Sequence, residues 1–163
     1  MLRRTMLVRS LSALGAILIL AAGCADQGPM ESLLTPRVSV LSMAHDAGVA
    51  SEEIGPEGGT IVFGNGSLTI PAGALAAPTT ITASVDGATL AVTFSPHGLV
   101  FPATAQPVLS FDVLGVQIPA DASIFYLGTS NEALERYEMT LDPVAGSAST
   151  RIGHFSPYAI AVE

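Results

Sequence analysis

The segment "TTITASV" (residues 79–85) alternates strictly between polar and apolar side chains. In an extended strand, its isoleucine, alanine and valine fall on one face, and its serine and two of its threonines fall on the other. The segment "VLSFDVL" (residues 108–114) repeats the pattern, with Leu109, Phe111 and Val113 opposed to Ser110 and Asp112. A period of two with one polar face is typical of an antiparallel sheet that is buried on one side.

Seven further short runs rich in Val, Ile, Thr and Phe accompany these two. They occupy residues 59–64, 67–70, 89–94, 123–128, 136–142, 147–153 and 155–162. Turn-forming residues separate the runs, and "GNGS" (64–67) and "DPVAG" (142–146) have the composition of hairpin turns. About eight or nine short strands predict an all-β fold, an antiparallel β-sandwich with one core between its sheets.

Two segments depart from this pattern. The sequence "SNEALERY" (130–137) is compatible with a single helical turn capped by Ser130 or Asn131. Residues 24–51 show no sustained period and are interrupted by proline and glycine, although "VSVLSM" (38–43) is compatible with one short strand. We therefore expect residues 24–51 to form a flexible tether and residues 52–163 to form the folded domain.

The first 23 residues have the features of an export signal. Arg3, Arg4 and Arg9 precede an apolar run at residues 11–22, which is too short to span a bilayer comfortably. A basic start followed by a short apolar run predicts a signal peptide that is cleaved.

The only cysteine of the chain, Cys24, directly follows this signal. The segment "AAGC" (21–24) resembles a bacterial lipobox, in which the cysteine thiol is lipidated and becomes the new N-terminus. Two or three acyl chains at Cys24 would give stable membrane anchoring. Because Asp26 is not directly after the cysteine, the resemblance implies the outer membrane in a cell that has one. The alternative is an ordinary secretory signal that leaves a soluble secreted or periplasmic protein.

Removal of residues 1–23 makes the chain strongly acidic. It retains only Arg37, Arg136 and Arg151 beside all fourteen acidic residues, a net charge of −11, and it contains no lysine. Nucleic-acid binding and electrostatic binding to an anionic membrane both need clustered basic residues, so we expect neither. A lipid on Cys24 is then the expected means of membrane attachment.

Four motifs occur in order along the expected domain: "GPEGGT" (55–60), "IPAGAL" (70–75), "SPHGLVF" (95–101) and "HFSPY" (154–158). Together they resemble a ZU-five domain, the β-sandwich module of zonula occludens proteins, netrin receptors and ankyrins. The resemblance covers residues 52–163. It implies a binding or structural module in a cell-envelope lipoprotein and a protein partner of unspecified identity.

The motif "HFSPY" also contains the one candidate for chemistry. In some eukaryotic ZU-five domains the chain cuts itself within a His-Phe-Ser sequence. That resemblance implies His154 as base, Ser156 as nucleophile and Phe155–Ser156 as the scissile bond; a serine hydroxyl beside a histidine fits such a step. We expect an intact closing strand, because alternation in 155–162 needs only a strand, and keep self-cleavage as the alternative.

Other chemistry has little support in the sequence. Hydrolase, metalloprotease and phosphate-binding motifs are absent, so no enzyme, cofactor or small-molecule substrate is expected. With three histidines and one cysteine, a zinc site is not expected, and His97 is expected to be a loop residue. Asp86, Asp121 and Asp142 are possible calcium ligands, but they form no EF-hand pattern, so no metal is expected.

Overall fold

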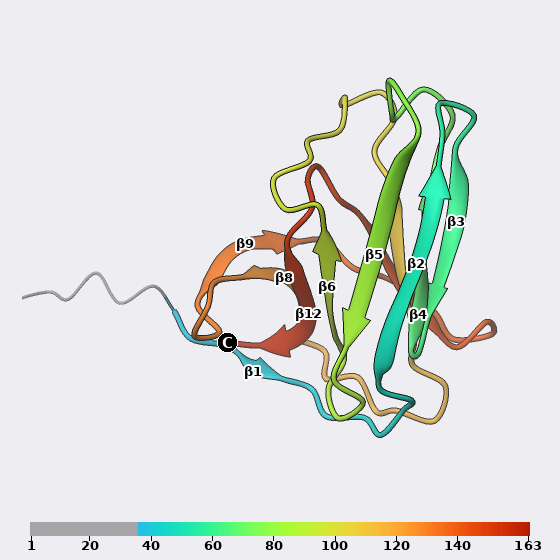
Figure 1. Cartoon of the computed structure of the whole chain (residues 1–163). Coiled ribbons are helices and arrows are strands. Elements are labelled where there is room, and N and C mark those ends of the chain that lie inside the picture. The colour runs from blue at the N-terminus through green and yellow to red at the C-terminus, as the bar shows by residue number, and fades with distance from the viewer. Residues whose placement is uncertain (1–35) are drawn as a thin grey trace, which may run out of the picture. The chain divides into compact units, whose positions relative to one another are not determined.

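The structure, a computed structural model, describes residues 36–163; the expected signal peptide and Cys24 lie outside the described residues. These residues form two antiparallel sheets, which confirms the all-β sandwich (Figure 1). The strands are β1 (Ser39–Val40), β2 (Gly48–Ile54), β3 (Gly59–Phe63), β4 (Gly66–Ile70), β5 (Thr79–Val85), β6 (Ala91–Ser95), β7 (Val108–Asp112), β8 (Ser123–Leu127), β9 (Ala133–Tyr137), β10 (Thr140–Asp142), β11 (Ser147–Arg151) and β12 (Pro157–Val162).

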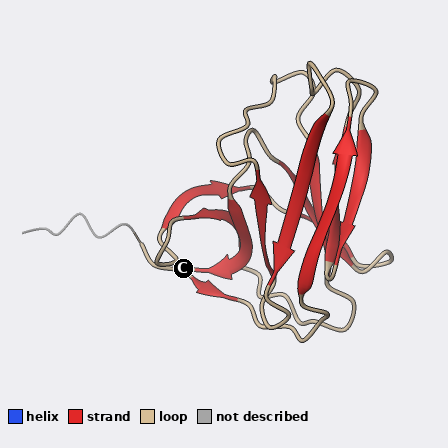
Figure 2. Cartoon of the chain, viewed as in Figure 1, coloured by secondary structure: helices blue, strands red, loops and turns tan. Residues whose placement is uncertain are grey.

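The larger sheet has the strand order β2-β5-β6-β12-β8-β9, with β1 paired to β12. The smaller sheet has the order β10-β11-β7-β4-β3. Strands and loops account for all of the described chain (Figure 2). Accordingly, nothing between residues 36 and 163 provides a helix long and apolar enough to cross a bilayer.

The alternating patterns face the core as expected. Ile81, Ala83 and Val85 of β5 are buried, as are Leu109 and Phe111 of β7. The predicted turn between residues 64 and 67 is confirmed as the two-residue connection between β3 and β4. The predicted turn at 142–146 is confirmed as the connection between β10 and β11.

The expected tether is wrong for residues 36–51. Strand β2 begins at Gly48 and pairs over its whole length with β5, and β1 pairs with the end of β12. Val38 is buried against Phe125 in a small second cluster. These residues lack a sustained period because most of them lie at an exposed edge: in β2 only Ile54 is fully buried.

The expected helical turn at 130–137 is also wrong. Residues Ala133–Tyr137 form β9, which pairs with β8 across an irregularity at Tyr126/Leu127. The expected strand at 136–142 is divided, because the chain leaves β9 after Tyr137 and enters the other sheet at β10. This division and the two N-terminal strands raise the number from eight or nine to twelve.

Strand β12 is buried on both faces rather than on one. Its four central residues, from Tyr158 to Ala161, have no exposed surface. Tyr158 and Ile160 face the main core, whereas Ala159 and Ala161 belong to the small cluster with Val38 and Phe125. The N-terminal segment therefore covers the outer side of the last strand, so that this strand has no polar face.

Candidate functional site

The three residues singled out in the sequence lie at the bend that leads into β12. The Nδ1 atom of His154 is 2.9 Å from the hydroxyl oxygen of Ser156, and that hydroxyl lies 2.7 Å from the carbonyl oxygen of Phe155. Ser156 is buried, with 7% of its surface exposed, whereas His154 is partly exposed. The structure thus brings the candidate base and nucleophile together at the candidate scissile bond.

The hydrogen bonds among His154, Ser156 and the Phe155 carbonyl allow two arrangements, which differ in where the protons lie. The Ser156 hydroxyl has one proton, so it donates either to the Phe155 carbonyl or to Nδ1 of His154. In the first state Nδ1 must carry a proton and donate to Ser156, so His154 is not a base. In the second state Nδ1 accepts the serine proton, which is the arrangement that general-base activation requires.

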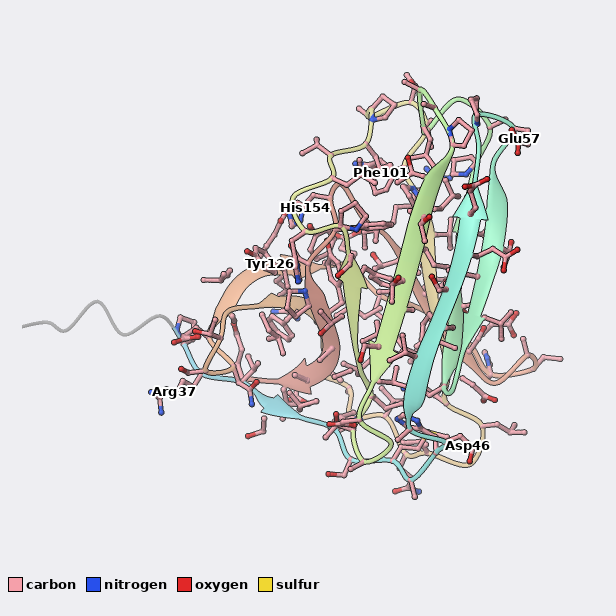
Figure 3. All side chains as sticks on the ribbon, in the orientation of Figure 1. Arg37, Asp46, Glu57, Phe101, Tyr126 and His154 are labelled. Atoms are coloured by element: carbon pink, nitrogen blue, oxygen red, sulfur yellow. The ribbon has the colours of Figure 1, made fainter. Side chains whose placement is uncertain are left out.

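Glu135 completes a chain of polar groups behind the histidine. Its Oε2 atom lies 3.5 Å from Nε2 of His154 and accepts a 2.7 Å hydrogen bond from the Tyr137 hydroxyl. Glu135 and Tyr137 both come from β9, where positions two apart share one face of the strand. Tyr126 adds an edge-on ring contact to His154 from the neighbouring strand β8, at 5.0 Å between ring centroids (Figure 3).

Tyr158 holds the same bend from the core side. Its hydroxyl donates a 2.7 Å hydrogen bond to the carbonyl oxygen of His154, and its ring packs edge-on against Tyr137 at 5.6 Å. Burial, together with the hydrogen bond to Glu135, raises the pKa of Tyr137 to about 12. Burial also raises the pKa of Tyr158 far above its ordinary value. Both tyrosines are therefore neutral donors at any physiological pH.

The candidate scissile peptide is held by the loop between β6 and β7. The Phe155 carbonyl accepts a 3.2 Å hydrogen bond from the Gly98 N–H, and the Phe155 N–H donates to Leu99 at 2.8 Å. The Phe155 side chain is fully buried, stacked on Phe94 at 5.2 Å and edge-on to Phe101 at 5.0 Å. The loop that contains "SPHGLVF" thus has a structural function: its backbone hydrogen bonds hold the residues before β12 in place.

This arrangement is compatible with two functions. As a structural element, it satisfies the polar groups at a buried bend through hydrogen bonds within the protein. As a reactive element, it supplies a nucleophile, a base and a backbone donor, Gly98 N–H, on the carbonyl oxygen of the bond. The same contacts serve both functions, so the geometry is compatible with either one.

The remaining candidates do not join this group. His97 is exposed in its loop. Asp86 and Asp142 each accept hydrogen bonds from backbone N–H groups of their own turns, and the bond from Ala88 lowers the pKa of Asp86. Asp121 is exposed in the loop before β8. Across residues 36–163, no group of three or more His, Cys, Asp or Glu side chains is placed to hold a metal ion.

Sequence reasoning missed Glu135, Tyr137, Tyr158 and Gly98 as neighbours of the motif. Glu135 and Tyr137 were hidden because residues 130–137 were interpreted as a helical turn. In a strand, their i, i+2 spacing places them on one face. Tyr158 stands four residues after His154, and only the bend before β12 brings its hydroxyl back to the His154 carbonyl. No signal in the sequence points to Gly98, which acts through its backbone.

Comparison with known proteins adds no relative to these observations. No family model matches this chain, and no curated protein sequence matches it.

Proposed function

We propose that this protein is an exported lipoprotein, anchored by lipid on Cys24, whose β-sandwich is a binding module of the ZU-five type. The observation that carries the proposal is the pairing of β1 with the end of β12. This pairing brings the N-terminal entry into the fold and the C-terminus to one side of the sandwich (Figure 1). The side with β2, β3 and β4 lies away from this N-terminal entry (Figure 1).

The short distance between lipid and fold supports the same proposal. Twelve positions separate Cys24 from Pro36, where the described chain begins. A fully extended chain of that length reaches at most about 40 Å. The sandwich is thus held close to the membrane surface, as expected for a module that meets partners within the envelope.

Detergent phase partitioning of the protein expressed in a bacterium tests the anchor. The full chain is expected in the detergent phase and Cys24→Ser in the aqueous phase. A Cys24→Ser variant that stays in the detergent phase would exclude lipid on this residue as the anchor. Cross-linking in intact envelopes tests the binding role, with discrete adducts of the chain expected; a chain that is recovered only as a monomer would argue against it.

A second candidate function is self-cleavage between Phe155 and Ser156, which the 2.9 Å separation of His154 Nδ1 and Ser156 Oγ favours. In this reaction Ser156 Oγ attacks the Phe155 carbonyl carbon while its proton passes to Nδ1. The carbon–nitrogen bond then breaks, and the nitrogen of Ser156 takes that proton. Water hydrolyses the resulting ester to a Phe155 carboxylate and a free Ser156 hydroxyl.

Mass spectrometry of the wild type, Ser156→Ala and Ser156→Cys tests this second candidate. A fragment beginning at Ser156 in the wild type, retained with Cys and lost with Ala, would support cleavage. An uncut wild type that stays uncut after prolonged incubation would exclude it. Circular dichroism of each variant verifies that the sandwich is folded, since Ser156 is buried.

A further inference from the structure

One open edge of each sheet, β2 in the larger and β3 in the smaller, lies on the side of the sandwich away from β1 (Figure 1). Within residues 36–163, β2 pairs only with β5 and β3 pairs only with β4, and β2 packs against β3 (Figure 1). Strand β2 is the longest of the open edges: its seven residues pair with β5 in uninterrupted register. A regular, unpaired edge presents free backbone donors and acceptors to an incoming extended chain.

An apolar groove follows this seam. It has a volume of about 210 Å³ and is lined by residues 46–50 and 62–64. Val49 and Val62, the exposed valines of the two strands, are each 71% exposed. Small-molecule pockets enclose roughly 300–1,000 Å³, so this groove fits an apolar side chain of a peptide better than a free ligand.

The charged side chains along β2 and just beyond its two ends are all carboxylates. Glu52 and Glu53 are exposed on β2, and Asp46 and Glu57 lie beyond its two ends (Figure 3). No lysine or arginine occurs in the sequence between Arg37 and Arg136. An occupant of this edge therefore gains from positive charge and loses from negative charge.

We propose that β2 and the groove beside β3 bind an extended partner segment in which apolar residues adjoin consecutive lysines or arginines. Its apolar residues pack over Val49 and Val62 at the groove, and consecutive basic residues lie beside Glu52 and Glu53, which point to opposite faces of β2. Charge disfavours both alternatives within this protein. A second copy carries a net charge of −11 after signal removal, and residues 24–35 contain Asp26 and Glu31 but no basic residue.

This inference rests on the proposed binding function, and its test has a separate readout. The probe is a blocked heptapeptide with valines in one half and lysines in the other, added to the isotopically labelled mature chain carrying Cys24→Ser. Amide NMR signals of residues 48–54 and 59–63 are expected to shift, and amide exchange in β2 is expected to slow. A peptide with glutamate in place of lysine serves as the ligand control and is expected to leave these signals unchanged.

Variants that remove negative charge test whether the peptide binds at the β2 edge. The Glu52→Gln/Glu53→Gln double variant is expected to weaken binding by roughly fivefold, the size expected for two exposed charge pairs. The matched control, Asp121→Asn/Glu138→Gln, removes the same charge outside the seam and is expected to bind like the parent chain. A Val62→Ser variant is expected to weaken binding without any change in charge.

Four results would overturn the inference. Equal weakening by both double variants would mean that the peptide binds to overall charge. Protection, without peptide, of the β2 amides that do not bond to β5 would mean that the chain's own residues occupy the edge, and concentration-dependent dimerisation through β2 would identify a second copy. If cross-linked adducts form in the envelope but the peptide does not bind, this binding surface is rejected and the proposed binding function stands. If the peptide binds but no adducts form in the envelope, the proposed function in the cell is rejected.

Discussion

The hydroxyl of Tyr158 donates a 2.7 Å hydrogen bond to the carbonyl oxygen of His154, four residues earlier in the chain. This hydrogen bond links the bend before β12 to the core, because the Tyr158 ring is fully buried. It also fixes the backbone on which His154 presents its imidazole to Ser156. The position of the candidate site is thus a consequence of how the last strand is packed.

The change Tyr158→Phe is expected to destabilise the fold. It removes the donor to a partly buried carbonyl and preserves nearly all of the ring packing, at a cost of roughly 1–3 kcal/mol in the free energy of unfolding. Urea unfolding at neutral pH measures the loss. Tyr126→Phe is the matched control, because it also removes a tyrosine hydroxyl and keeps the ring contacts with His154 and Tyr158; equal losses in the two variants would contradict the assigned role.

Alkaline pH is expected to destabilise the protein from about pH 10 upward. The pKa of Tyr137 is raised to about 12 and that of Tyr158 is raised further, whereas both ionise near 10 in the unfolded chain. Below pH 10 both states hold the phenolic protons, so this stability is fully present. Between pH 10 and 12 the unfolded state releases protons that the folded state retains, and the free energy of unfolding falls.

Urea midpoints across this pH range test that prediction. The chain has no lysine, so few other groups titrate there. A Tyr137→Phe variant is expected to show a shallower decline than the wild type. If the wild-type midpoint stayed constant from pH 10 to 12, the two tyrosines would not be the buried neutral donors described above.

The change Gly58→Ala is expected to destabilise the corner between β2 and β3. Gly58 has φ of +81°, and a Cβ there would collide with the carbonyl oxygen of Ile70. Gly73 is a suitable control, because it has φ of +79° but open space around it. Gly73→Ala thus carries only the backbone strain, on the order of 1 kcal/mol, and thermal unfolding should show a larger loss for Gly58→Ala.

Truncation is expected to show that the folded domain begins well before residue 52. A chain of residues 52–163 lacks β1 and most of β2, and it uncovers the outer face of Phe125 and Ala159. We expect it to be unfolded or to have a much lower urea midpoint than residues 36–163. Equal midpoints would show that residues 36–51 are dispensable and that the tether extends to residue 51.

The sequence was a good guide wherever one side of a strand faces water. The alternation in β5 and β7 and the composition of the β3–β4 turn predicted both the strands and their buried faces. It was a poor guide to β2 and β9, which are edge strands with few buried residues. Their pairing depends on β5 and β8, which are distant in sequence, so local pattern does not reveal it.

The candidate site shows the same division. The sequence was enough to predict that His154, Phe155 and Ser156 lie together, because the three are consecutive. The contribution of Glu135 could not be predicted from the sequence, since it depends on β9 being a strand and on β8 lying between β9 and β12. Backbone contacts such as the Gly98 N–H on Phe155 carry no side-chain signal at all.

The most direct test of the central proposal is the intact mass of the mature protein, extracted in detergent from bacterial membranes. We expect one species that begins at Cys24, carries two or three acyl chains and continues uncut to Glu163. An unlipidated chain with a different N-terminus would contradict the lipoprotein proposal. A lipidated chain that ends at Phe155 would retain the anchor and establish self-cleavage in place of the intact closing strand.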